Sequence, residues 1–151
     1  KTGFIGFIAE QESTIKAFTE IQRKLELSLL TLRLGVFIVM LMWTVDKFVR
    51  VDHAKIVFEK FYLLTGFENA IMYVLAGAEL LLILAFLVGI KKRWSYGLVF
   101  LLHGVSTVSS FKQYLNPFEG GNLLFYAAWP MLAACFTLYL LRDYDRKFSL
   151  S

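Results

Sequence analysis

Apolar residues along this chain gather in four long blocks, at residues 27–45, 70–90, 94–111 and 123–141, and polar segments separate the blocks. A helix needs about 20 mostly apolar residues to cross the roughly 30 Å hydrocarbon core of a bilayer. Each block has this length or nearly so, and the third is the most polar. A segment in lipid must be helical, because every backbone N–H and C=O group needs a partner within the chain. The pattern therefore predicts an all-α fold, an integral membrane four-helix bundle.

The short connection between the second and third blocks indicates the topology. It consists of Lys91, Lys92 and Arg93, so the two spans must form an antiparallel hairpin. Three positive charges in a short loop are typical of the cytoplasmic side of a membrane. The N-terminal arm, this loop and the C-terminal tail together hold ten Lys and Arg residues, against five in the two remaining loops. We therefore expect both termini to lie in the cytoplasm.

The N-terminal arm, residues 1–26, carries a helical pattern of its own. Apolar positions recur every three or four residues, which predicts a helix that begins at about Ser13 and runs straight into the first span. This arm either lies on the membrane surface or extends from the first span as a solvated helix. The chain then divides into the arm, a transmembrane domain at 27–141 and a cytoplasmic tail at 142–151.

The loop between the first two spans, residues 46–68, is also patterned. A stripe of apolar residues at helical spacing faces away from Lys55, Glu59 and Lys60, which predicts a short amphipathic helix. Asp52 is a candidate cap for its start and Gly66 a candidate for its end. The helix either caps the bundle or docks a partner. The stripe consists of Ala54, Val57, Phe58, Phe61 and Tyr62.

The fourth block contains Pro130, which removes one backbone hydrogen bond and predicts a kink. The loop before this block, residues 116–122, reads as a turn in which Asn122 caps the fourth span.

Three ionisable residues fall at membrane depth: Arg33, Glu79 and His103. A charged side chain at the centre of a bilayer costs about 2.5–3.5 kcal/mol on insertion scales, so its presence needs a reason. At 1.5 Å per residue, Glu79 and His103 come near mid-membrane, and the long Arg33 side chain reaches toward them. We expect the three to meet, with Arg33 paired to Glu79. The set is either an internal network that fixes helix register or a polar pocket, such as a quinone headgroup site or a proton-accepting carboxylate.

Composition bears on the class of protein and on which ligands it can bind. The chain is 58 % hydrophobic and 19 % charged, against about 25 % charged in a typical soluble domain. The net charge is +4, but the basic residues lie beside apolar blocks, so we expect them to face lipid headgroups and not nucleic acid. His53 and His103 lie at different levels, and paired Cys and His spacing is lacking, so neither haem nor metal is expected. The single Cys135 cannot form an internal disulfide.

Short motifs in the first two blocks match a known pattern. The first block has an Arg, a Gly two residues later and a Lys near its outer end, although Trp43 stands where a further Gly is common. The second block has a Gly–x–Glu start and a Gly followed by basic residues. The matching positions are Arg33, Gly35, Lys47, Gly77, Glu79 and Gly89. Over residues 27–141 the chain thus resembles the DoxX family, and the long N-terminal arm lies outside the family's usual pattern.

The resemblance implies a four-helix bundle in a prokaryotic cytoplasmic membrane. Members of the family are associated with redox complexes, including the DoxD-type subunit of thiosulfate:quinone oxidoreductase and a mycobacterial oxidoreductase complex. We therefore expect a membrane subunit of a quinone-linked oxidoreductase complex, in contact with lipid and other subunits, that holds a quinone near Arg33, Glu79 and His103. Two alternatives stay open: a structural or assembly subunit without a ligand of its own, and a small transporter or proton pathway.

Overall fold

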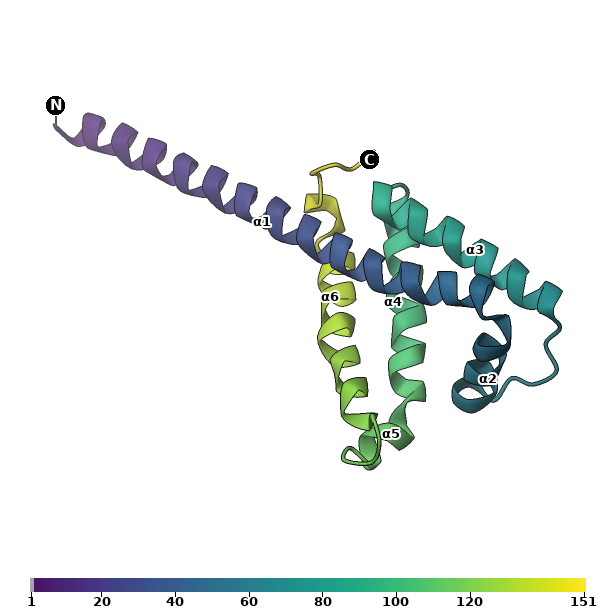
Figure 1. Ribbon diagram of the computed structural model, residues 1–151. Helices are drawn as coiled ribbons and strands as arrows, with labels where there is room; N and C mark the ends of the chain where they lie inside the picture. The colour runs from purple at the N-terminus through teal and green to yellow at the C-terminus, as the bar shows by residue number, and fades with distance from the viewer. Residues whose placement is uncertain (1) are drawn as a thin grey trace.

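The computed structural model describes residues 2–151, and all of its regular elements within that range are helices (Figure 1). This confirms the all-α prediction. In chain order the elements are α1 (Thr2–Val49), α2 (Val51–Tyr62), α3 (Asn69–Val88), α4 (Lys92–Ser109), α5 (Phe111–Leu115), the 3₁₀ helix η1 (Asn122–Ala127), α6 (Ala128–Leu140) and the 3₁₀ helix η2 (Arg142–Tyr144).

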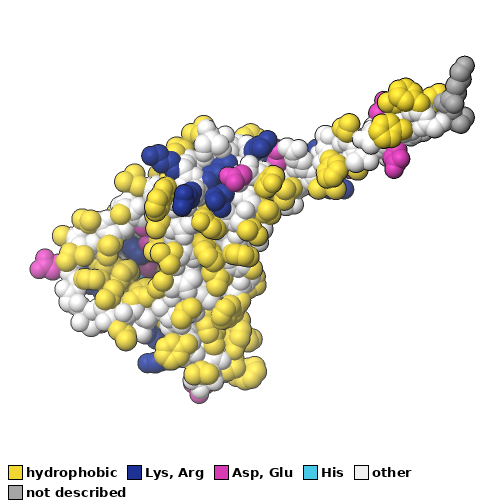
Figure 2. All heavy atoms as spheres, turned by 180° about the vertical axis from the view of Figure 1, so that it is seen from behind, with side chains coloured by type: hydrophobic (Ala, Val, Ile, Leu, Met, Phe, Trp, Pro, Cys, Tyr) yellow, Lys and Arg dark blue, Asp and Glu magenta, His cyan; other side chains and the backbone are white. Residues whose placement is uncertain are grey.

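Three helical segments are long and apolar enough to cross a membrane: Gly3–Val49, Asn69–Val88 and Asn122–Leu140. Much of their apolar surface is exposed, as at Ile38, Val74 and Leu81, and hydrophobic side chains are spread over the whole visible face of the body in Figure 2. Large exposed apolar surfaces of this kind mark contact with a membrane or a partner. The helices are therefore compatible with lipid contact and with a multi-pass membrane protein. The helix α4 carries more polar side chains, as its sequence predicts.

The long helices pack as two antiparallel pairs. The first pair is α1 with α3, the second is α4 with α6, and the pairs also contact each other through α3 with α4 and α1 with α6. Helices of a regular four-helix bundle lie within about 20° of one another. Here the first pair instead runs across the second at a wide angle (Figure 1), as in the steeper ridge-into-groove packings of globular proteins.

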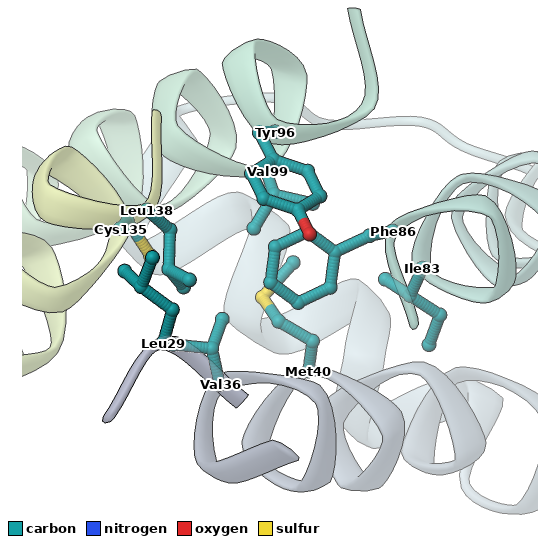
Figure 3. Packing of buried hydrophobic residues seen from close by; sticks show 9 residues of the cluster. All are labelled: Leu29, Val36, Met40, Ile83, Phe86, Tyr96, Val99, Cys135 and Leu138. Carbon is teal, nitrogen blue, oxygen red and sulfur yellow. The ribbon is translucent and has the colours of Figure 1, made fainter. Parts of the chain in front are cut away.

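The apolar core lies where the two pairs cross, and each long helix contributes to it (Figure 3). The rings of Phe86 and Tyr96 lie 4.9 Å apart at its centre. Burying a side chain of this size contributes roughly 1.5–3 kcal/mol. The core therefore ties α3 to α4 across the crossing. Its members are Leu29, Val36, Met40, Ile83, Phe86, Tyr96, Val99, Cys135 and Leu138.

The N-terminal arm forms the first half of α1, which begins at Thr2 and not at the predicted Ser13. Gly3 and Gly6 weaken a helix, but nothing in this segment breaks one. The helix has 48 residues, so it is about 70 Å long at 1.5 Å per residue. Side chains at residues 3–24 are exposed, and the arm projects away from the body (Figures 1 and 2).

The helix α2 confirms the amphipathic prediction. Ala54 is buried, and the ring of Phe61 lies 5.8 Å from the ring of Phe125 in η1, so the apolar stripe faces the body as a cap. Its ends differ from the prediction. Asp52 makes no capping hydrogen bond. The helix ends at Tyr62 with Leu63 as its left-handed C-cap (φ of 57°), and Gly66, which also has a positive φ of 77°, lies beyond the end of the helix.

The fourth apolar block changes helix type near Pro130. The segment before it is the 3₁₀ helix η1, and Pro130 falls in the first turn of α6, where a missing N–H costs little. The predicted kink therefore takes the form of a switch from 3₁₀ to α geometry. Asn122 opens η1, but its side chain donates to the Asn116 carbonyl 2.9 Å away and does not cap the helix.

Candidate functional site

A buried polar cluster lies where the C-terminal tail meets the body. We call it the tail cluster. It consists of Arg33 of α1, Lys92 and Tyr96 of α4, and Asp145 of the tail. Arg33 and Asp145 are fully buried. Tyr96 donates its hydroxyl proton to Asp145 Oδ2 at 2.6 Å, and Arg33 Nη1 lies 3.7 Å from the same oxygen. The cluster thus joins three segments that are far apart in the sequence.

Backbone groups of the tail complete the cluster. Arg33 Nη2 donates to the carbonyls of Lys147 and Phe148, the latter at 3.3 Å. Lys92 Nζ donates to the Asp145 carbonyl at 2.5 Å. A guanidinium has five donors in a fixed fork, so one Arg side chain can bind a carboxylate and two carbonyls together. These contacts hold the tail against the helices.

The two fully buried charges of the tail cluster, on Arg33 and Asp145, form an ion pair. A buried charge is tolerated only when a partner compensates it, and Arg33 and Asp145 compensate each other. Burial lowers the pKa of the Lys92 ammonium, and the nearby Asp145 carboxylate opposes this effect. Two buried polar atoms of the cluster, Arg33 Nε and Asp145 Oδ1, have no hydrogen-bond partner among the described residues.

The C-terminal tail packs closely against the turn after α3. Gly89 has φ of 72°, and a Cβ at this position would lie 2.2 Å from Ser149 Oγ and 3.2 Å from Arg33 Nη1. The backbone N–H of Leu150 donates to the Val88 carbonyl at 2.8 Å. Both the backbone conformation and the space therefore require glycine here.

A second polar set joins α1 to α3 farther from the tail. Lys47 Nζ lies 3.0 Å from Glu79 Oε2, and Thr44 Oγ1 lies 2.7 Å from Glu79 Oε1. Thr44 is fully buried, whereas the Lys47 and Glu79 side chains are 13 % and 17 % exposed. We call these three residues the Glu79 set. Its carboxylate is paired, but it remains partly accessible from outside.

His103 belongs to a third set, between α4 and α6. Its Nε2 lies 2.9 Å from the Ala128 carbonyl and 3.3 Å from Thr107 Oγ1. A carbonyl only accepts hydrogen bonds, so Nε2 carries a proton in this arrangement. His103 therefore binds the start of α6 to α4.

The predicted pairing of Arg33 with Glu79 is wrong. Arg33 pairs with Asp145, and Glu79 pairs with Lys47. The reason is that the tail folds back and supplies a carboxylate at the level of Arg33. Among the described residues, no hydrogen bond or ion pair joins any two of Arg33, Glu79 and His103.

Asp145 and Tyr96 were not predicted from the sequence. Asp145 lies in a charged tail that reads as solvated, and Tyr96 lies among apolar residues, so neither stands out. The requirement that a buried Arg33 have a counter-charge was the available signal. The triad at the end of α1, where Asp46 contacts Arg50 and His53, each at 2.6 Å, was not predicted either. This triad borders a shallow, mostly apolar concavity of about 380 Å³.

A larger concavity of about 830 Å³ lies beside the tail cluster, and we call it the basic cleft. The turn between α3 and α4 forms one wall and the C-terminal tail forms the other. Figure 2 shows Lys and Arg side chains gathered where the arm leaves the body. The charged residues that line the cleft are Lys91, Lys92, Arg93, Arg142, Asp143 and Arg146.

Comparison of the chain with models of protein families, with curated proteins and with solved structures gives no match. In the part of the chain that the structure describes, no three His, Cys, Asp or Glu side chains come together as a potential metal site.

Proposed function

We propose that this chain is a membrane protein with four spans and that it serves as the membrane subunit of a quinone-linked redox complex. The observation that carries the membrane part is the large apolar surface of helices long enough to cross a bilayer. The crossed helix pairs fit a bilayer if each pair tilts, and spanning helices tilt by up to about 40°. The redox part rests on the resemblance of residues 27–141 to the DoxX family.

The distribution of charge supports cytoplasmic termini. The tail, the turn between α3 and α4 and the base of the arm lie at one end of the body (Figure 1), and this end holds the basic cleft. Basic residues near span ends favour the cytoplasmic side.

Cysteine labelling tests this topology. In a Cys135→Ala background, we expect Lys91→Cys to react with an impermeant maleimide only after intact cells are opened. Glu119→Cys, at the opposite end, should react in intact cells. The reverse pattern would contradict the orientation, and a chain that stays in solution without detergent would contradict the membrane proposal itself.

Within such a complex, the long arm is suited to bind another subunit. It extends about 35 Å beyond the body at 1.5 Å per residue, and its apolar side chains are exposed, for example Ile15 at 64 % and Phe18 at 68 %. Exposed apolar residues on a projecting helix mark a surface that contacts another protein or the membrane. The internal pairing of Arg33 with Asp145 likewise favours the assembly role for the body, because Arg33 already has a counter-charge within the chain.

The second candidate function is quinone binding. Among the predicted site residues, the Glu79 set is the more accessible to a ligand. Arg33 is fully enclosed, whereas Glu79 and Lys47 are partly exposed. A carboxylate beside an ammonium can accept the proton that accompanies quinone reduction, and Lys47 can donate a hydrogen bond to a quinone carbonyl.

Quinone retention separates the two candidates. If the chain holds quinone, the protein purified in mild detergent should retain it, and Glu79→Gln should lose most of it. Glu68→Gln, an exposed control before α3, should retain it. Normal retention in a folded Glu79→Gln protein would exclude the Glu79 site. Purified protein without quinone, bound stably to other subunits, would support the assembly role.

A further inference from the structure

The basic cleft is the feature of the molecule that internal pairing leaves unexplained. Its lining includes five cationic side chains and one carboxylate side chain, that of Asp143. Lys91, Arg93 and Arg146 are exposed, and none of them forms an ion pair within 4.0 Å among the described residues. The cleft therefore carries more positive than negative side-chain charge, and it favours an anionic ligand.

The two walls of the cleft are held in place from within. Lys92 donates to the Asp145 carbonyl, and Leu150 donates to the Val88 carbonyl, so the tail is fastened to the turn between α3 and α4. Arg142 is fixed by a hydrogen bond of 2.7 Å to the Tyr139 carbonyl and lies over the Tyr139 ring at 4.5 Å. A preformed cleft binds a ligand with a smaller loss of conformational entropy than loose surface side chains do.

An exposed aromatic residue indicates the level of the cleft relative to a membrane. Trp94 lines the cleft and is 66 % exposed. Tryptophan is enriched at the boundary between hydrocarbon and headgroups. Exposed apolar residues of α4 follow Trp94 at spacings of three or four residues, namely Leu98, Leu101 and Val105, so the cleft opens at headgroup level in the proposed orientation.

We propose that the basic cleft binds the phosphate of an anionic phospholipid, with Lys91, Arg93 and Arg146 as its direct contacts. Basic pockets at the cytoplasmic ends of spanning helices are suited to anionic headgroups. A guanidinium group can bind two oxygens of one phosphate in a bidentate contact. The acyl chains then lie along the apolar surface below Trp94. The inference rests on the proposed membrane location but not on the redox assignment.

Lipid retention in native mass spectrometry tests the proposal. The whole chain is purified in mild detergent and mixed with equal amounts of phosphatidylglycerol and phosphatidylcholine. The wild type should retain phosphatidylglycerol preferentially, and added salt should weaken the preference. The triple variant Lys91→Gln, Arg93→Gln, Arg146→Gln should bind phosphatidylglycerol roughly tenfold or more weakly.

A matched control removes three charges from the other end of the molecule: Lys55→Gln, Lys60→Gln, Lys112→Gln. This variant should keep the preference of the wild type. Equal losses in both triple variants would show that net charge alone acts, and would overturn the site. If excess inorganic phosphate displaced the lipid fully from the wild type, the ligand of the cleft would be a free phosphate anion and the lipid assignment would fail.

The outcomes also separate this inference from the membrane proposal. A wild type that retains both lipids without preference would overturn the cleft and leave the membrane location intact. A wild type that retains neither lipid and is soluble without detergent would overturn both. The salt dependence of the wild type requires no variant, so the test stands even if the triple variant fails to fold.

Discussion

The substitution Asp145→Asn tests whether one buried ion pair holds the tail to the body. The new side chain has nearly the same shape but no charge, so Arg33 keeps its place and loses its counter-ion. At 3.7 Å between Nη1 and Oδ2, the Coulomb attraction is about 4.5 kcal/mol for an effective dielectric constant of about 20. Removing one partner of a buried pair typically costs about 3–5 kcal/mol. We expect the free energy of unfolding to fall by this amount.

Thermal melting of the protein in mild detergent measures the effect. For a chain of this size, a loss of about 3–5 kcal/mol lowers the melting temperature by about 10 °C. Limited trypsin digestion gives a second measure. Arg146 and Lys147 are exposed, but the backbone beside them is held by Arg33, and a released tail can adopt the extended conformation that trypsin cleaves. The control is Asp143→Asn, two residues earlier, whose side chain is exposed. This control should melt and digest like the wild type.

A double variant separates the charge interaction from shape. Arg33→Gln combined with Asp145→Asn removes both charges and leaves groups that can still form hydrogen bonds. Its loss should be smaller than the sum of the two single losses, because neither single charge is left buried without a partner. If Asp145→Asn behaved like Asp143→Asn, or if the single losses simply added, the ion pair would not be what fastens the tail.

Two further pairs of substitutions test other parts of the structure by melting temperature. Gly89→Ala should destabilise the protein by at least about 1–2 kcal/mol, because the residue has positive φ and its Cβ would displace Ser149. The control Gly35→Ala, at a helical site with free space, should leave the free energy of unfolding unchanged or raise it by up to about 1 kcal/mol. Glu79→Gln should cost about 3 kcal/mol by leaving Lys47 unpaired. Adding Lys47→Met should restore part of that loss, and a purely additive result would argue against coupling.

The helices could be predicted from the sequence because local patterns determine them. Apolar blocks at 70–90 and 94–111 correspond to α3 and α4 within about two residues, which is the usual uncertainty of helix ends. The extension of α1 to Thr2 was missed because Gly3 and Gly6 disfavour helix only weakly. The crossing of the two helix pairs was missed because it depends on how ridges and grooves fit, and periodicity does not encode that fit.

The polar contacts could be predicted only in part. Their predicted depth in a membrane identified Arg33 and Glu79 as residues in need of partners, and both are paired. The choice of partner depends on the folded tail and on the rotation of α3 about its axis. Neither follows from counting residues along one segment, so Asp145 in a charged tail was read as solvated.

The buried residues of α1 show what these two polar contacts achieve together. Val36 and Met40 are buried between Arg33 and Thr44, and all four lie on one stripe because their spacings are three or four residues. Apolar residues on such a stripe tolerate a shift by one turn, about 5.4 Å, since one aliphatic side chain replaces another. A shifted Arg33 or Thr44 would lose its partner, so the polar contacts at the two ends fix the register that the apolar core between them leaves free.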